Sequence, residues 1–99
     1  MTINKTEENG KTTIALEGRL DTGTAPKLQE ELMPVFGMTN EIALDFSRLV
    51  YVSSAGLRVL LMAQKESKKK GVPMTLAGVS GEIMEVFEMT GFADMLNII

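Results

Sequence analysis

The sequence predicts an α/β fold, a single domain with a mixed, mostly parallel central sheet, an N-terminal hairpin and helices packed on the sheet. Strand-like and helix-like hydrophobic patterns alternate along most of the chain, which favours parallel strands joined by right-handed crossovers. Asn9-Gly10 marks a tight hairpin turn near the N-terminus. The length of 99 residues and the apolar content of 44% suit one domain, residues 1–99, with its own core.

Composition excludes several functional classes. The chain has no cysteine and no histidine, so the usual metal ligands and the usual general base are absent and no cofactor is expected. The net charge of −3 argues against nucleic acid as a partner. No apolar run approaches the length of a membrane helix and no signal-peptide pattern opens the chain, so we expect no membrane association and a cytoplasmic location.

The N-terminal third is predicted as a hairpin followed by a loop and a helix. Residues Thr2–Glu8 and Lys11–Glu17 form the two arms, and Gly18–Pro26 has the composition of a loop. Thr24 is a candidate N-cap, and Pro34 predicts a kink or an early end of the helix. The apolar stripe of this helix consists of Leu28, Leu32, Val35 and Phe36.

The central stretch runs from a strand directly into a second helix. Ile42, Leu44 and Phe46 alternate as in a strand. Small residues at 52–56 then open a helix in which Leu57, Leu60 and Leu61 are expected to face the core.

The C-terminal third repeats this order on a smaller scale. Lys68–Lys70 before Gly71 indicate a helix end. A short strand is predicted over Met74–Ala77, and Ser80 is a candidate cap of a third helix that ends at Gly91. Leu96–Ile99 is expected to form a last strand or a packed tail, and the seven internal methionines are expected to fill the core.

Ser54 stands at the start of the second predicted helix. A helix start carries unpaired backbone N–H groups and the positive end of the dipole, so a hydroxyl there can cap the helix and a phosphate there is well accommodated. On local sequence alone a cap is the commoner role for such a serine, and the two roles are compatible. A switching role requires that the side-chain oxygen of Ser54 project into water.

Four segments together resemble the STAS domains of bacterial anti-sigma factor antagonists. They occur in the family's order and span nearly the whole chain. The segments are Gly18–Asp21 with Thr24–Pro26, Leu44–Ser47, Ser53–Leu57, and Phe87–Phe92.

The resemblance implies a partner-switching module without enzymatic activity. In that family, an anti-sigma factor that is itself a serine kinase phosphorylates a serine at the start of the second helix, and a phosphatase removes the phosphate. The unphosphorylated form binds the anti-sigma factor and frees a sigma factor. The family's serine corresponds to Ser54 here. Ser53 stands where the family commonly has Asp and is a second candidate, whereas Ala55 stands where the family commonly has Ser or Thr.

The same resemblance, together with proximity to Ser54 along the second helix, predicts a partner-binding surface. Its residues are Asp21, Thr24, Ser53, Ser54, Ala55, Gly56, Leu57, Arg58 and Met62.

Two alternatives remain open. A small serine hydrolase would use Ser54 as a nucleophile at a strand-to-helix turn, but the GxSxG pattern and a histidine base are missing. A non-phosphorylated STAS scaffold in a larger regulatory complex is compatible with Ser53 in place of the family's Asp.

Overall fold

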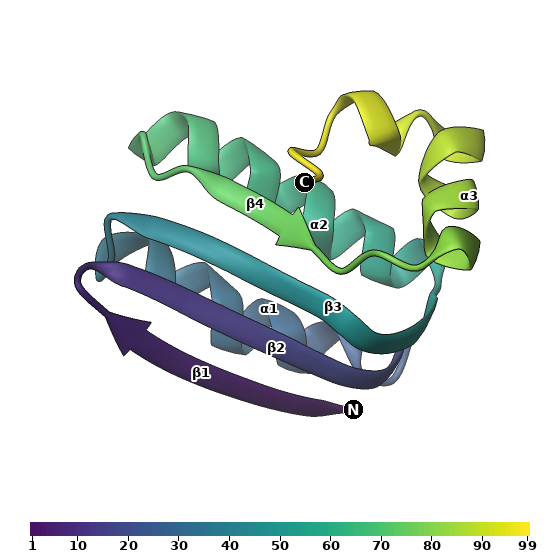
Figure 1. Cartoon of the computed structure of the whole chain (residues 1–99), viewed down its shortest axis with the longest axis horizontal. Coiled ribbons are helices and arrows are strands. Elements are labelled where there is room, and N and C mark those ends of the chain that lie inside the picture. The colour runs from purple at the N-terminus through teal and green to yellow at the C-terminus, as the bar shows by residue number, and fades with distance from the viewer.

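A four-stranded sheet in the order β1-β2-β3-β4 forms the centre of the computed structural model, which describes residues 1–99 (Figure 1). The first pair of strands is antiparallel and the other two pairs are parallel, which confirms the predicted mixed, mostly parallel sheet. The elements are β1 (Thr2–Glu8), β2 (Lys11–Leu20), α1 (Ala25–Leu32), the 3-10 helix η1 (Met33–Gly37), β3 (Glu41–Val52), α2 (Ser54–Lys70), β4 (Met74–Ala77), α3 (Gly81–Thr90) and the 3-10 helix η2 (Phe92–Asp94).

The N-terminal hairpin turns where the sequence predicts it. Asn9 and Gly10 both have positive φ angles, 52° and 82°, as a tight turn between right-twisted strands requires. The second arm is longer than predicted. Arg19 pairs with Tyr51 and Leu20 pairs with Val52, so residues assigned to a loop from their composition instead extend β2.

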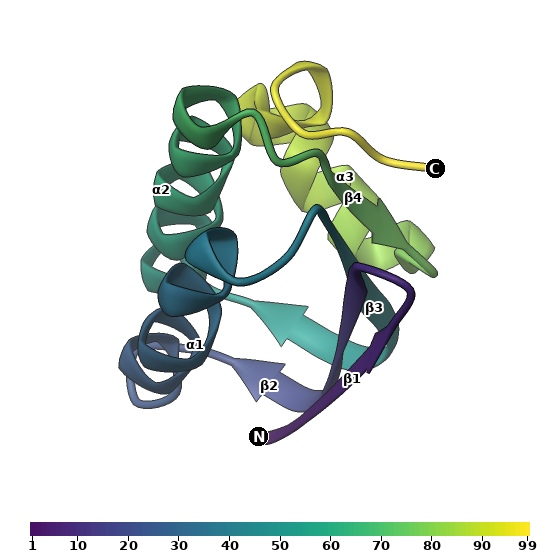
Figure 2. The same cartoon turned by 90° about the vertical axis from the view of Figure 1, so that its left-hand side faces the viewer.

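Helices α1 and α2 lie side by side on one face of the sheet, and the opposite face carries no helix (Figure 2). Successive side chains of a strand point to opposite faces of the sheet, and the larger apolar side chains of β2 and β3 point toward these helices. The central layer of the core is fully buried and contains Ile14, Leu16, Leu28, Leu32, Ile42, Leu44, Phe46 and Leu60. Leu61, expected in this layer, is half-buried, and Val59 is buried in addition to Leu57 and Leu60.

Strand β3 departs from simple alternation in its second half. Its pairing with β2 shifts register between Ala15 and Glu17 and again between Gly18 and Arg19. Each shift adds a residue to β3 relative to β2, so the buried positions after Phe46 are three residues apart, at Leu49 and Val52.

Pro34 ends α1 as predicted. The α-helix stops at Leu32, and the chain continues as a 3-10 turn that has Pro34 near its start. Val35 and Phe36 stay buried in this turn, so the apolar stripe continues although the helix does not.

Helix α3 packs at the end of the sheet toward which β4 points, and the last residues of the chain return alongside β4 (Figure 1). Gly71 and Gly91 end α2 and α3 with positive φ angles, and Ser80 caps α3 by accepting from the N–H of Ile83 at 3.2 Å. The rings of Phe87 and Phe46 lie 6.3 Å apart. The last residues form only a single bridge to β4, through Ile98, and are better described as a packed tail.

The prediction that methionines fill the core is confirmed for Met74, which is fully buried, and in part for Met33 and Met84, which are half-buried against the core. It is wrong for Met38 and Met89, which are 67% and 86% exposed. No helix is both long enough and apolar enough to cross a membrane.

Candidate phosphorylation and partner-binding site

The carboxyl ends of β2 and β3 meet at the start of α2. The N–H of Ser53 donates to the carbonyl oxygen of Leu20 at 2.8 Å, which ties the beginning of the helix to the neighbouring strand. Ligand-binding residues of α/β proteins commonly gather at this edge of a sheet.

Ser53, and not Ser54, is the N-cap of α2. Its backbone is extended, its Oγ accepts from the N–H of Gly56 at 3.4 Å, and its carbonyl oxygen accepts from the N–H of Leu57 at 2.9 Å. The suggestion that Ser54 caps the helix is therefore wrong. Strand β3 continues to Val52, so the single residue between strand and helix takes the capping conformation.

Ser54 is the first residue of α2, and its side chain is exposed to solvent. Its hydroxyl has no hydrogen-bond partner in the domain, whereas that of Ser53 is occupied by the cap. The first N–H groups of a helix have no partner within the helix, and the dipole is positive at this end. An anion attached to Ser54 would therefore lie near unpaired backbone N–H donors at the positive end of the helix.

The loop between β2 and α1 is held by a closed set of hydrogen bonds around Asp21. Its Oδ1 accepts from the N–H groups of Gly23 at 3.0 Å and Thr24 at 3.1 Å. Partial desolvation opposes ionisation of Asp21, but the hydrogen bonds from Thr24 and Gly23, together with the nearby Arg19, hold its pKa below the usual range.

Thr24 occupies the N-cap position of α1, but its side chain makes no capping bond. Its Oγ1 instead accepts from the N–H of Asp21 and donates to the carbonyl oxygen of Arg19, each at 2.8 Å. Thr24 therefore stabilises the loop and does not cap α1. Pro26 in the first turn of α1 has no N–H group that would need a partner.

Arg19 is exposed near the end of β2. Its guanidinium is 4.1 Å from the centre of the Tyr51 ring, and its Nε is 3.8 Å from Oδ2 of Asp21. This cation–π and ionic contact joins the ends of β2 and β3 to the loop. Sequence reasoning missed Tyr51, whose role depends on the pairing of Arg19 with it across the two strands.

A groove of about 260 Å³ lies between α1 and α2, and Ala55, which follows Ser54 in the chain, is part of its lining. It brings together Ala55, Arg58 and Met62 of the predicted surface. Sequence reasoning missed its other wall, which only the packing of α1 on α2 creates. The groove is lined by Thr22, Ala25, Pro26, Gln29, Ala55, Arg58, Val59 and Met62.

Two residues of the predicted surface face inward. Leu57 is 7% exposed, and Gly56 is buried, with no room for a Cβ next to Leu20. Both position the first turn of α2, while the side chains of Ser54 and Arg58 next to them are exposed.

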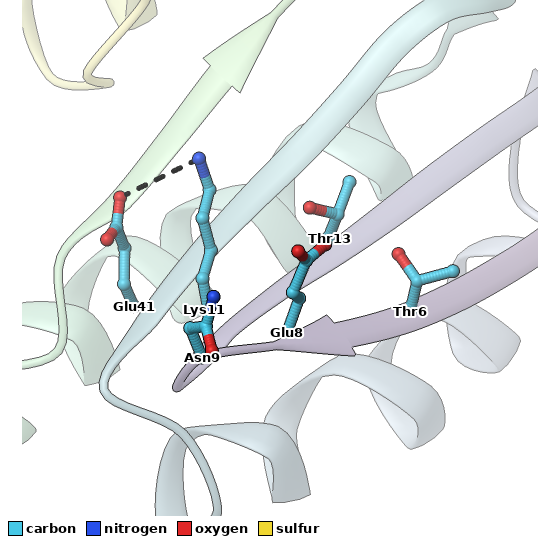
Figure 3. Close-up of a pocket in the computed structure, with 6 residues that line it drawn as sticks. All are labelled: Thr6, Glu8, Asn9, Lys11, Thr13 and Glu41. Carbon is cyan, nitrogen blue, oxygen red and sulfur yellow. Dashed lines mark ion pairs between the residues drawn. The ribbon is translucent and has the colours of Figure 1, made fainter.

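A second hollow lies on the open face of the sheet at the hairpin end, far along β2 and β3 from Ser54 (Figure 3). It has a volume of about 460 Å³, and Lys11 and Glu41 form an ion pair of 4.0 Å across it. No three Asp or Glu side chains of the domain gather closely enough to hold a metal ion.

Comparison with known proteins places the whole chain in one family. The family model of the STAS domain matches residues 2–99. The anti-sigma-B factor antagonist of Listeria monocytogenes is 33% identical over 87 residues, covering 86% of this chain and 75% of that protein. That of Bacillus subtilis is 30% identical over 85 residues, covering 86% and 78%.

Solved structures show the same fold. The anti-sigma factor antagonist SpoIIAA in its unphosphorylated form superposes with a TM-score of 0.78 and 18% identity, covering 99% of this chain and 87% of that one. The phosphorylated form of the Bacillus protein superposes equally well, at 0.78 with 19% identity, covering 99% and 91%. The chain therefore belongs to the STAS domain family, together with these anti-sigma factor antagonists.

Proposed function

We propose that this chain is an anti-sigma factor antagonist and not an enzyme, and that phosphorylation of Ser54 controls its partner. The unphosphorylated form binds an anti-sigma factor that is a serine kinase, and the bound sigma factor is thereby released. The kinase then transfers the γ-phosphoryl group of ATP to Oγ of Ser54, ADP and the hydroxyl proton leave, and the complex dissociates. A serine phosphatase restores the binding form.

The observation that carries this proposal is the position of Ser54. Its hydroxyl is exposed, unpaired and at the first position of a 17-residue helix, and the next residue, Ala55, lines the groove between α1 and α2. The relatives named anti-sigma-B factor antagonists and the existence of SpoIIAA in phosphorylated and unphosphorylated forms support the same function.

The phosphate acts on the interface and not on the fold. At a helix N-terminus an added negative charge stabilises the helix by about 0.3–1 kcal/mol. It also brings about −1.5 to −2 charges and three acceptor oxygens to the surface that the partner must cover. Binding is therefore lost while the domain stays folded.

Ser53 is the weaker candidate for the phosphorylated residue. It is half-buried and its Oγ caps α2 through the N–H of Gly56. A phosphate on Ser53 would have to break the cap, whereas Ser54 can be modified without loss of any hydrogen bond.

The test is a phosphorylation assay with candidate anti-sigma factor kinases and ATP, followed by mass spectrometry of the peptide that contains both serines. We expect one phosphate on Ser54, none in Ser54→Ala, and normal incorporation in Ser53→Ala. A kinase that binds the chain without phosphorylating either serine would replace this proposal with the non-phosphorylated scaffold.

A further inference from the structure

We infer that Arg58 is the intramolecular counter-ion of phosphorylated Ser54, and that phosphorylation thereby withdraws this guanidinium from the groove between α1 and α2. The inference rests on the proposed phosphorylation of Ser54. It adds a second component to the switch, because the partner loses a cation as well as meeting a phosphate.

The two residues lie on the same face of α2. Ser54 is its first residue and Arg58 follows four positions later. Side chains at this spacing are neighbours on the helix surface, with Cβ atoms about 5–6 Å apart. Both side chains are exposed, so neither must leave the core for the pair to form.

Arg58 is free to change partner. The ion pairs of the domain use Lys5, Lys11, Arg19 and Arg48, and none uses Arg58. The carboxylate of Asp21 in the adjacent loop is already bound by backbone N–H groups and paired with Arg19. A phosphate on Ser54 therefore competes with water alone for the guanidinium.

The chemistry of the two groups is matched. A guanidinium can donate two parallel hydrogen bonds to a phosphate, which a lysine ammonium cannot reproduce. The arginine follows the phosphoserine along the chain, so the anion stays at the positive end of the helix dipole.

Capture of Arg58 changes the charge of the groove. Arg58 is the only charged residue among the eight that line it, and its apolar neighbours include Val59 and Met62. An acidic side chain of a partner can pair with Arg58 when Ser54 is unmodified. After phosphorylation the guanidinium is occupied and the rim of the groove carries net negative charge.

The experiment uses the full chain with phosphoserine incorporated at position 54 during translation, so it does not depend on any kinase. The second pKa of the phosphate, which is near 6 in an unperturbed phosphoserine, is measured by 31P NMR titration. We expect it to rise by about 0.2–0.4 units in Arg58→Gln, as an ion pair at this spacing implies. The signal of the Arg58 Nε–H should also move on phosphorylation.

Lys65→Gln is the matched control. Lys65 is exposed and lies on the same face of α2. Its position is about 16 Å from Ser54 along the helix axis, which exceeds the distance over which charges interact at physiological ionic strength. Lys65→Gln should leave the phosphate pKa unchanged. Arg58→Lys should give a phosphate pKa between that of the unsubstituted protein and that of Arg58→Gln. The inference is overturned if Arg58→Gln and Lys65→Gln give the same pKa. Failure of every kinase to phosphorylate Ser54 would instead remove the proposed function on which it rests.

Discussion

A Cβ placed on Gly56 would lie 2.7 Å from Cγ of Leu20 and 3.1 Å from its carbonyl oxygen. The first turn of α2 therefore packs against the end of β2 at a distance that only glycine permits. The same carbonyl oxygen accepts the N–H of Ser53. This contact fixes the direction in which α2 leaves the sheet, and with it the position of Ser54 on the surface.

Gly56→Ala should destabilise the domain by about 1–3 kcal/mol, because the added methyl group forces the helix away from backbone and side-chain atoms of Leu20. Urea denaturation followed by circular dichroism measures the loss. Gly81→Ala is the matched control, since Gly81 opens α3 and a Cβ there meets nothing within 4 Å. The control should be neutral or slightly stabilising, and equal losses in both variants would contradict the close contact.

Ser53→Ala should lower the stability of the domain more than Ser54→Ala, although the two residues are adjacent. Removal of the cap at Ser53 should cost about 0.5–2 kcal/mol, whereas Ser54 makes no hydrogen bond to lose.

Ser54→Asp should leave the melting temperature nearly unchanged while it weakens binding to the anti-sigma factor. Thermal denaturation and a binding assay separate the two effects, and a drop of several degrees in Ser54→Asp with unchanged binding would refute the interface mechanism.

Asp21 should contribute a pH-dependent part of the stability. Its pKa in the folded state is below the ordinary value of 3.8, so its contribution to stability is present above about pH 3.8 and is lost as the pH falls through the lowered folded-state pKa. The advantage of the native protein over Asp21→Asn should therefore be largest near neutral pH and shrink in acid. Melting temperatures of both proteins from pH 7 to pH 3 test this, and a difference that grows in acid would show that the sign is wrong.

Ser67→Ala should lower the free energy of unfolding, because it removes a buried side-chain hydrogen bond in the turn between α2 and β4. The hydroxyl of Ser67 is buried and donates to the carbonyl oxygen of Val72 at 2.6 Å. Its loss leaves that carbonyl oxygen without this donor and should cost about 1–3 kcal/mol. Thr90→Ala removes a bond of similar length, 2.7 Å to Val86, at an exposed residue. The exposed change should cost clearly less in the same chemical denaturation experiment.

The sequence by itself determined the α/β class, the hairpin at Asn9-Gly10, the end of α1 before Pro34 and the caps at Ser80, Gly71 and Gly91. Each depends on local chemistry, such as a positive φ angle, a missing N–H or a short hydroxyl side chain. Ser54 could be singled out for the same reason, since small polar residues between a strand and a helix mark a helix start.

Only the tertiary structure decided which serine caps α2, how far β2 extends and what lies beside Ser54. Strand pairing carries β3 to Val52, which moves the cap to Ser53 and leaves the hydroxyl of Ser54 free. Pairing with β3 likewise keeps Gly18–Leu20 in a strand despite its loop-like composition. The groove next to Ser54 joins side chains from two helices that are far apart in sequence. Such features depend on the packing of elements against one another, and no local pattern in a single sequence encodes that packing.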